Sequence, residues 1–355
     1  MDYDLDRVRE AASPEVVSGR PGGMWRWREL LAVEDPDRIV SLGEGSTPLR
    51  PSPRLATDLA VARVWVKDEG ENPTGTFKAR GASAGVTAAV ERAAGDLALP
   101  TAGNAGVAWA AYGAAAGLAV HVAMPADAPP ELVRACRSLG AELTLVDGLI
   151  SDAGMVVAER IAEHGSYDAG TLREPYRIDG KKTLGFEIVE QLGWRFPDVV
   201  VYPAGGGVGL IGMWRAFGQL RELGWAAGDV PRLVVTQSDG CAPLVRAFEA
   251  GADDTKPWDG ARTIAHGLRV PDPIGGRLVL RALRETGGTA VAVPDDEIVA
   301  ARPLMAAGAG VRPSSEGAAT LAAATFLRER GDLGADDVVV LVNTGRDPVP
   351  GLPLP

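Results

Sequence analysis

The segment VVVYPAGGGVGLIG, residues 199–212, joins an apolar run to a cluster of glycines. Its first five residues predict a buried β-strand, because valine and tyrosine favour extended backbone. The glycines leave several backbone N–H groups unhindered, and the residues after them predict the start of a helix. A helix N-terminus attracts anions, so this strand, turn and helix together indicate a phosphate-binding loop in an α/β protein.

The rest of the chain continues this alternation. Runs rich in β-branched residues alternate with stretches whose apolar residues recur at helical spacing, a pattern typical of parallel sheets with crossover helices. The predicted strands are 63–67, 118–125, 142–147, 198–203, 232–237, 289–294 and 338–343. The predicted helices are 106–117, 152–164, 182–194, 209–223, 241–250, 295–307 and 314–330. We therefore predict an α/β fold, with a long loop over 251–276.

Charge and composition exclude several classes of protein. The 355 residues include 36 Lys and Arg against 47 Asp and Glu, a net charge of −11, which argues against binding to nucleic acid or to an anionic membrane. The 2 cysteines cannot form a disulfide framework or a zinc site, and we predict no metal. The acidic start MDYDLD does not fit a signal peptide, and no apolar run approaches the roughly 18 residues of a spanning helix. The expected compartment is the cytoplasm.

A lysine follows a helix-start signal in NPTGTFKARG, residues 72–81. Because the positive end of a helix disfavours a nearby ammonium group, the free amine of Lys78 should be more available as a nucleophile. A lone lysine at a helix start is more often a solvated side chain.

Two other polar segments follow short apolar runs. TAGNAG, residues 101–106, surrounds Asn104 with small residues, so backbone N–H groups can approach a ligand closely. LVNTGRD, residues 341–347, ends a predicted strand with the hydroxyl of Thr344. Open α/β sheets bind ligands at such strand ends, although each segment alone would be an ordinary turn.

Residues 207–212 also match the pattern G-x-G-x-x-G of dinucleotide-binding proteins. The acidic residue expected at the end of the next strand is replaced by Gln237, and Asp239 comes late. An NAD-dependent dehydrogenase therefore stays as an alternative from another class.

Five motifs, taken together in their order along the chain, indicate a particular enzyme family. They are EGSTPL (44–49), NPTGTFK (72–78), Gly103-Asn104, GKKT (180–183) and the glycine loop 205–209. Together they resemble the fold-type II, tryptophan synthase β-like, pyridoxal-phosphate-dependent enzymes, and among these the threonine synthase group. The resemblance runs from about residue 41 to residue 347.

The resemblance implies an overall architecture. It implies two open, twisted, mostly parallel sheets flanked by helices, with the cofactor pyridoxal 5′-phosphate in the cleft between two domains, and a homodimer. The larger domain would comprise residues 1–59 and 181–355, and the smaller, inserted domain residues 60–180.

The resemblance also implies roles for individual residues. Lys78 would form the Schiff base with the cofactor and move the α proton. Asn104 would bind the cofactor's 3-oxygen, Thr344 would meet its pyridine nitrogen, and Phe77 would pack beside its ring. The cofactor phosphate would be bound by the backbone of Gly205, Gly206, Gly207, Val208 and Gly209.

Substrate contacts follow from the same resemblance. The substrate carboxylate would be surrounded by Thr101, Ala102, Gly103 and Ala105. Arg80 and Lys182 are candidates for a substrate phosphate, because one offers a bidentate fork and the other a point charge. A structural ion pair is an equally good interpretation of Arg80. Glu316 could cap its helix or could face the cofactor, and we favour the cap.

The favoured reaction converts O-phospho-L-homoserine and water to L-threonine and phosphate. Many threonine synthases have an acidic residue after the lysine, where this chain has Ala79, and the family's usual ending is replaced by residues 344–350. These departures keep two relatives open: a threonine or serine dehydratase, and a synthase that replaces a β substituent of an amino acid.

Overall fold

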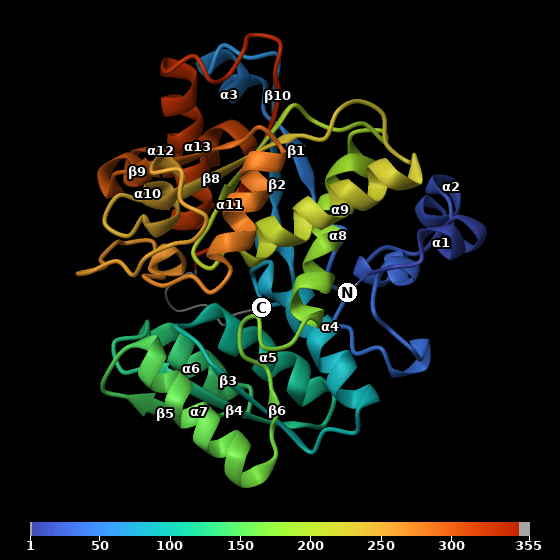
Figure 1. The fold of residues 1–355 in the computed structure, drawn as a ribbon, viewed down its shortest axis with the longest axis vertical. Helices are drawn as coiled ribbons and strands as arrows, with labels where there is room; N and C mark the ends of the chain where they lie inside the picture. Colours follow the sequence, from blue (N-terminus) through green and yellow to red (C-terminus); the bar gives the residue numbers. More distant parts are fainter. Residues whose placement is uncertain (1, 348–355) are drawn as a thin grey trace.

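The chain forms two parallel or mostly parallel sheets with helices packed around them (Figure 1). The computed structural model describes residues 2–347. A six-stranded sheet has the order β1 (Leu49–Pro51), β2 (Arg63–Asp68), β10 (Val338–Asn343), β7 (Val199–Pro203), β8 (Arg232–Ser238) and β9 (Thr289–Val293). A four-stranded sheet has the order β5 (Glu142–Val146), β4 (Ala119–Pro125), β3 (Asp96–Pro100) and β6 (Tyr167–Asp168). Only the β1–β2 pair is antiparallel among these strands.

Helices connect the strands and cover both sheets. The α-helices are α1 (Leu5–Ala11), α2 (Pro14–Ser18), α3 (Pro53–Asp58), α4 (Lys78–Glu91), α5 (Asn104–Ala115), α6 (Pro130–Ser138), α7 (Ile150–His164), α8 (Tyr176–Gln191), α9 (Val208–Leu223), α10 (Pro243–Glu249), α11 (Gly276–Glu285), α12 (Asp295–Ala309) and α13 (Ser315–Glu329). Short 3-10 helices are η1 (Met24–Leu30), η2 (Pro36–Arg38), η3 (Glu69–Glu71) and η4 (His266–Leu268). No helix in this described part is long and apolar enough to cross a membrane.

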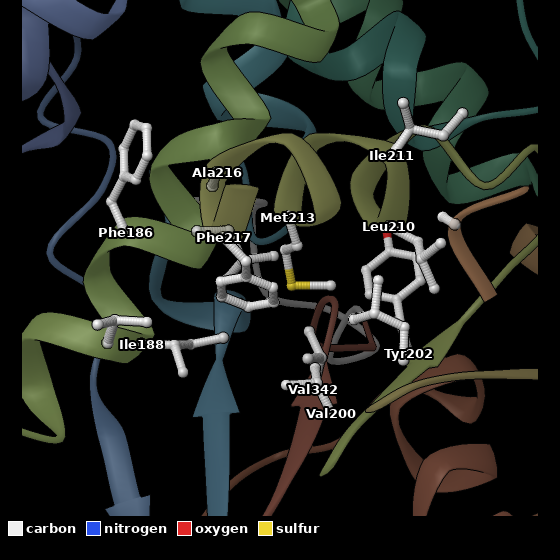
Figure 2. Close-up of a cluster of buried hydrophobic side chains, with 14 of the residues drawn as sticks. Phe186, Ile188, Val200, Tyr202, Leu210, Ile211, Met213, Ala216, Phe217 and Val342 are labelled. Atoms are coloured by element: carbon white, nitrogen blue, oxygen red, sulfur yellow. The ribbon is translucent and has the colours of Figure 1, made fainter. Parts of the chain in front are cut away.

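The largest core lies between the six-stranded sheet and helices α8 and α9. Figure 2 shows Val200 and Val342 from adjacent strands facing Met213 and Phe217 of α9, and all four are buried. Every residue of β7 is buried, because helices cover both faces of the sheet. This burial explains why the strand that opens the glycine loop is a continuous apolar run.

The predicted α/β fold is confirmed, and each predicted strand is present within one or two residues. The predicted strands did not include β1, β3 or β6, and the predicted helices did not include α11 or the short helices α1, α2 and α3. Strands β1 and β6 have only 3 and 2 residues, and α11 begins at Gly276 without a side-chain cap. Helix α8 begins at Tyr176, six residues before the predicted start at 182. The earlier start places residues 176–181 within the helix, and two of them lie in the candidate active site described below.

The division between the sheets differs in one place from the predicted domains. The four-stranded sheet uses strands within residues 96–168, which lie inside the predicted smaller domain. Strand β2 also falls within the predicted range 60–180, yet it pairs with β1 and β10 in the six-stranded sheet. The last predicted residues of the larger domain, 348–355, lie outside the described residues.

Candidate active site

Three predicted site segments meet at one edge of the six-stranded sheet. Lys78 follows β2, Thr344 follows β10 and the glycine loop follows β7, and these strands are parallel neighbours. The Phe77 N–H donates to the Thr344 carbonyl at 3.0 Å, and Thr76 pairs with Gly345. The Phe77 ring also packs edge-on against Tyr202 of β7, at 6.1 Å between centroids. The carboxyl ends of these strands thus place Lys78 beside the two other segments.

Lys78 is the first residue of α4, and its Nζ lies 4.5 Å from the centroid of the Phe77 ring. The pKa of Lys78 is lowered from 10.5 to about 8, first by burial and then by the positive charge of Arg177, with Glu316 opposing both. The sequence attributed a more available amine to the helix terminus, whereas burial is the largest cause in the structure. A pKa near 8 leaves part of the lysine as free amine near neutral pH.

The glycine loop is shaped so that only glycine fits at its critical positions. A Cβ on Gly205 would lie 2.3 Å from the Gly267 carbonyl oxygen, and one on Gly209 would lie 2.0 Å from the Tyr202 hydroxyl. Gly207 has φ +70°, and a Cβ there would lie 2.3 Å from Val279. No side chain caps the N-terminus of α9. The Tyr202 hydroxyl lies against Gly209 and accepts from its N–H, and the other first N–H groups of the helix are available to an anion.

The segment 101–105 lies on the other sheet, after β3. The Thr101 hydroxyl accepts a hydrogen bond from the Gly103 N–H at 3.0 Å. Gly103 has φ +153°, and a Cβ there would lie 2.4 Å from Leu132. Asn104 begins α5, which packs beside α4; its side chain is exposed and makes no hydrogen bond to another described residue. An amide in this state can bind a ligand between the sheets.

Arg80 does not face a ligand site in the structure. It is fully buried, with Nε 2.7 Å from Glu69 and Nη1 2.7 Å from Glu187. Its Nη1 and Nη2 also donate to Thr183 and Thr47. All three guanidinium nitrogens therefore bind protein groups, and Arg80 is corrected from a substrate-phosphate candidate to a structural ion pair.

Lys182 also points away from Lys78. Its Nζ lies 2.9 Å from Asp179 Oδ1 and 3.8 Å from the centroid of the Tyr3 ring. Asp179 in turn accepts hydrogen bonds from the Tyr3 hydroxyl and from the Ala32 N–H. Lys182 thus holds the N-terminal segment against α8, which argues against its predicted role in binding substrate phosphate.

Two cations that sequence reasoning missed lie beside Lys78 instead. Lys181 is 3% exposed, and its Nζ lies 5.5 Å from the same Phe77 ring that Lys78 covers. Burial and the charges of Arg177 and Lys78 lower the pKa of Lys181 well below its usual value. Within residues 2–347, Lys181 has no hydrogen-bonding or ion-pair partner, and the buried Nη2 of Arg177 has no hydrogen-bond partner. This pair can bind an anion beside the reactive amine.

Arg177 and Lys181 were missed because the predicted helix began too late in the chain. Residues four apart share one face of a helix, so Arg177 and Lys181 lie together, while Lys182 is turned toward Asp179. With a predicted start at residue 182, both residues lay outside the helix, so their shared face could not be recognised. The motif GKKT carried the signal, but it did not tell which lysine faces the site.

A dinucleotide site would need an acidic side chain at the end of β8, where this chain has Gln237. Gln237 is buried, donates to the Ala204 carbonyl at 3.0 Å and accepts from the Leu244 N–H at 2.8 Å. A ribose-binding carboxylate is therefore absent from this strand end, which argues against the dehydrogenase alternative.

Comparisons with known proteins agree with this geometry. Residues 40–345 match the family described as "Pyridoxal-phosphate dependent enzyme". The chain is 34% identical to the threonine synthase of Methanocaldococcus jannaschii and 36% identical to that of Methanosarcina acetivorans, each over 97% of this chain and 84% of the relative. The fold is similar to that of maize serine racemase, with a TM-score of 0.75 and 23% identity over 86% of this chain and 89% of the other.

Proposed function

Because the chain belongs to the pyridoxal-phosphate dependent enzymes and, within them, to the threonine synthase family, we propose that it converts O-phospho-L-homoserine and water to L-threonine and phosphate. The observation that carries this proposal is the pair Arg177 and Lys181 beside Lys78. Arg177 pairs with Glu174 through Nε and donates to Thr171 through Nη1. Its Nη2 has no hydrogen-bond partner among the described residues, and neither does the Nζ of Lys181. A phosphorylated substrate brings an anion that this pair can bind, whereas threonine and serine have only a hydroxyl there.

The residues at the sheet edge fit pyridoxal phosphate. Lys78 offers a partly deprotonated amine, and the glycine loop offers N–H groups at a helix N-terminus. Thr344 is a buried residue at the end of β10, and its hydroxyl has no hydrogen-bond partner among the described residues. We propose that these groups hold the aldehyde-bearing ring, its phosphate and its ring nitrogen respectively, with Phe77 beside the ring and Asn104 at the 3-oxygen.

Bound pyridoxal phosphate supplies an electron-accepting ring that stabilises negative charge at the substrate carbons. Lys78 would take the proton from the substrate α carbon as free amine and return it as ammonium. Its pKa near 8 suits this exchange, because a general base works best when its pKa lies close to the working pH.

The substrate would be bound by its two anionic groups, the carboxylate and the phosphate. N–H groups of residues 101–105 would bind its carboxylate, on the side of the four-stranded sheet. Arg177 and Lys181 would bind its phosphate and stabilise the charge that develops when the bond between the γ carbon and oxygen breaks. One proton leaves the β carbon as the phosphate departs from the γ carbon. Water then adds its hydroxyl at the β carbon while its other proton ends on the phosphate, and a proton at the γ carbon completes the methyl group of threonine.

A panel of three amino acids tests this proposal. Purified enzyme loaded with cofactor is incubated with O-phospho-L-homoserine, L-threonine or L-serine, and amino acids, phosphate and 2-oxo acids are measured. We expect threonine and phosphate from the first substrate and, at most, slow formation of 2-oxo acid from the others. Faster formation of 2-oxo acid and ammonia from L-threonine would support the dehydratase instead. An inert result with all three would favour a β-replacement synthase.

The assembly and the domain division are also proposals. A homodimer is supported by apolar side chains exposed around the start of α7, such as Leu149 at 66% and Met155 at 59%. Light scattering of the purified protein tests it.

For the domain division, we propose that the smaller domain is inserted in the larger one, as predicted, but that it begins after β2. The cytoplasm remains the proposed compartment, supported by two free, buried cysteines, Cys136 and Cys241.

A further inference from the structure

Glu316 stands in the first turn of α13, partly buried, and its carboxylate binds another segment of the chain. Its Oε1 accepts a hydrogen bond from the Gly267 N–H at 2.7 Å. A Cβ on Gly267 would lie 2.7 Å from that oxygen and 3.1 Å from Cδ and Cγ, so the side chain packs directly on η4. The helix itself is capped by Ser314, whose hydroxyl accepts from the Gly317 N–H. Glu316 is therefore not the capping residue that the sequence suggested.

The segment that Glu316 holds lies against the glycine loop. The Gly267 carbonyl oxygen is 2.3 Å from the position of a Cβ on Gly205. Gly205 belongs to the loop that we assign to the cofactor phosphate, so the hydrogen bond of Glu316 braces the back of this loop. Removing the Glu316 carboxylate would remove this hydrogen bond between η4 and α13.

The start of α13 is also fixed to the strand end that carries Thr344. The Ser314 N–H donates to the Gly345 carbonyl at 3.0 Å and lies 3.3 Å from Asn343 Oδ1. Glu316 thus lies on a turn held by the residues on both sides of Thr344. A carboxylate on such a turn has a defined position relative to the site.

The second carboxylate oxygen, Oε2, has no hydrogen-bond partner among the described residues. The charged groups that act on Lys78 are Arg177 from α8, which disfavours its ammonium form, and Glu316 from α13, which favours it. Burial and the charges of Arg177 and Lys78 in turn lower the pKa of Lys181. Burial and the like charge of Glu316 raise the pKa of Asp347.

We infer that Glu316 is a positioning residue of this active site: its hydrogen bond to Gly267 braces the glycine loop, and its carboxylate, held on the turn beside Thr344, acts by its charge on Lys78. The inference rests on the part of the proposed function that places the cofactor at Lys78. It does not depend on which amino acid is the substrate.

Two variants separate the roles of the hydrogen bond and the charge. Glu316→Gln keeps an oxygen that can accept from Gly267 but removes the charge, and Glu316→Ala removes both. Glu329→Gln, at the exposed end of the same helix, is the control for a lost charge. The apoenzymes are mixed with pyridoxal phosphate, and the rate of colour formation is followed against pH, together with the dissociation constant of the cofactor.

For Glu316→Gln we expect cofactor affinity within about twofold of wild type and a midpoint of colour formation lower by about half a pH unit. For Glu316→Ala we expect the same lower midpoint and an affinity about tenfold weaker. A merely structural role would lower stability without moving the midpoint. The inference is overturned if Glu316→Gln keeps the wild-type midpoint, or if Glu316→Ala binds the cofactor as tightly as wild type. Because no amino-acid substrate is used, failure of the proposed reaction would leave this result unchanged.

Discussion

The Thr344 carbonyl accepts a hydrogen bond from the Phe77 N–H at 3.0 Å, which joins the end of β10 to the residue before Lys78. The two segments are far apart in the chain, yet β2 and β10 are parallel neighbours, so their carboxyl ends meet. This contact fixes Lys78 beside the strand end that we assign to the ring nitrogen of the cofactor. It also explains why Lys78, one of the five lysines of the chain, is placed for chemistry.

Lys78→Ala should abolish the colour of bound cofactor and lower activity by at least a factor of about 100, because no other amine takes its position. Absorption spectra and turnover measure both effects. Lys256→Ala, at an exposed lysine, serves as the control and should match wild type. A Lys78→Ala enzyme with full activity would contradict the site and revive the dinucleotide interpretation.

Lys181→Gln and Arg177→Gln should each lower kcat/KM for O-phospho-L-homoserine by about 10- to 100-fold, since each removes a charged hydrogen bond worth about 1.5–3 kcal/mol. Cofactor content should remain near wild type. Lys182→Gln is the matched control, because its amine binds Asp179. It should lower thermal stability and leave KM nearly unchanged. The phosphate assignment fails if Lys182→Gln raises KM and Lys181→Gln does not.

Arg80→Ala should destabilise the protein by about 3–5 kcal/mol, because Glu69 and Glu187 would stay buried without their partner. Arg281→Ala, which removes an exposed pair with Glu285, should cost only about 0.3–0.5 kcal/mol. Urea unfolding compares the two. A stable Arg80→Ala variant with a greatly raised KM would restore the predicted contact with substrate.

Gly205→Ala should weaken cofactor binding by about tenfold or more, because its Cβ would clash with the Gly267 carbonyl and move the loop. Gly218→Ala is the control on the helix that follows the loop, α9, where a Cβ meets no atom within 4 Å. It should be neutral or stabilising by about 0.5–1 kcal/mol. Equilibrium titration with pyridoxal phosphate gives both affinities, and equal affinities would argue against a phosphate cradle at this loop.

The rate at which wild-type apoenzyme captures pyridoxal phosphate should rise with pH through a midpoint near 8. Burial and the charge of Arg177 lower the pKa of Lys78 from 10.5 to about 8, so the reactive amine is scarce below this pH and predominates above it. Stopped-flow absorbance between about pH 6 and about pH 9 gives the profile. A midpoint near the ordinary lysine pKa would show that the amine is not buried in the way described.

Much of the site could be predicted from local sequence. Lys78 and residues 205–209 lie in short motifs whose roles depend on a strand end and a helix start close by in the chain. Arg80 could not be assigned in this way, because its partner Glu187 is distant in sequence and comes from α8. The choice between Lys181 and Lys182 needed the true start of α8. There the N-cap residue is Pro175, and the first N–H groups are bound by the carboxylate of Glu174, one residue before the usual capping position.

The fate of the water oxygen tests the central claim most directly. The enzyme is given O-phospho-L-homoserine in water labelled with a heavy oxygen isotope, and products are analysed by mass spectrometry. The account predicts equal amounts of threonine and phosphate, with the label in the threonine hydroxyl and none in the newly released phosphate. Labelled phosphate with unlabelled homoserine, or a 2-oxo acid without threonine, would contradict it.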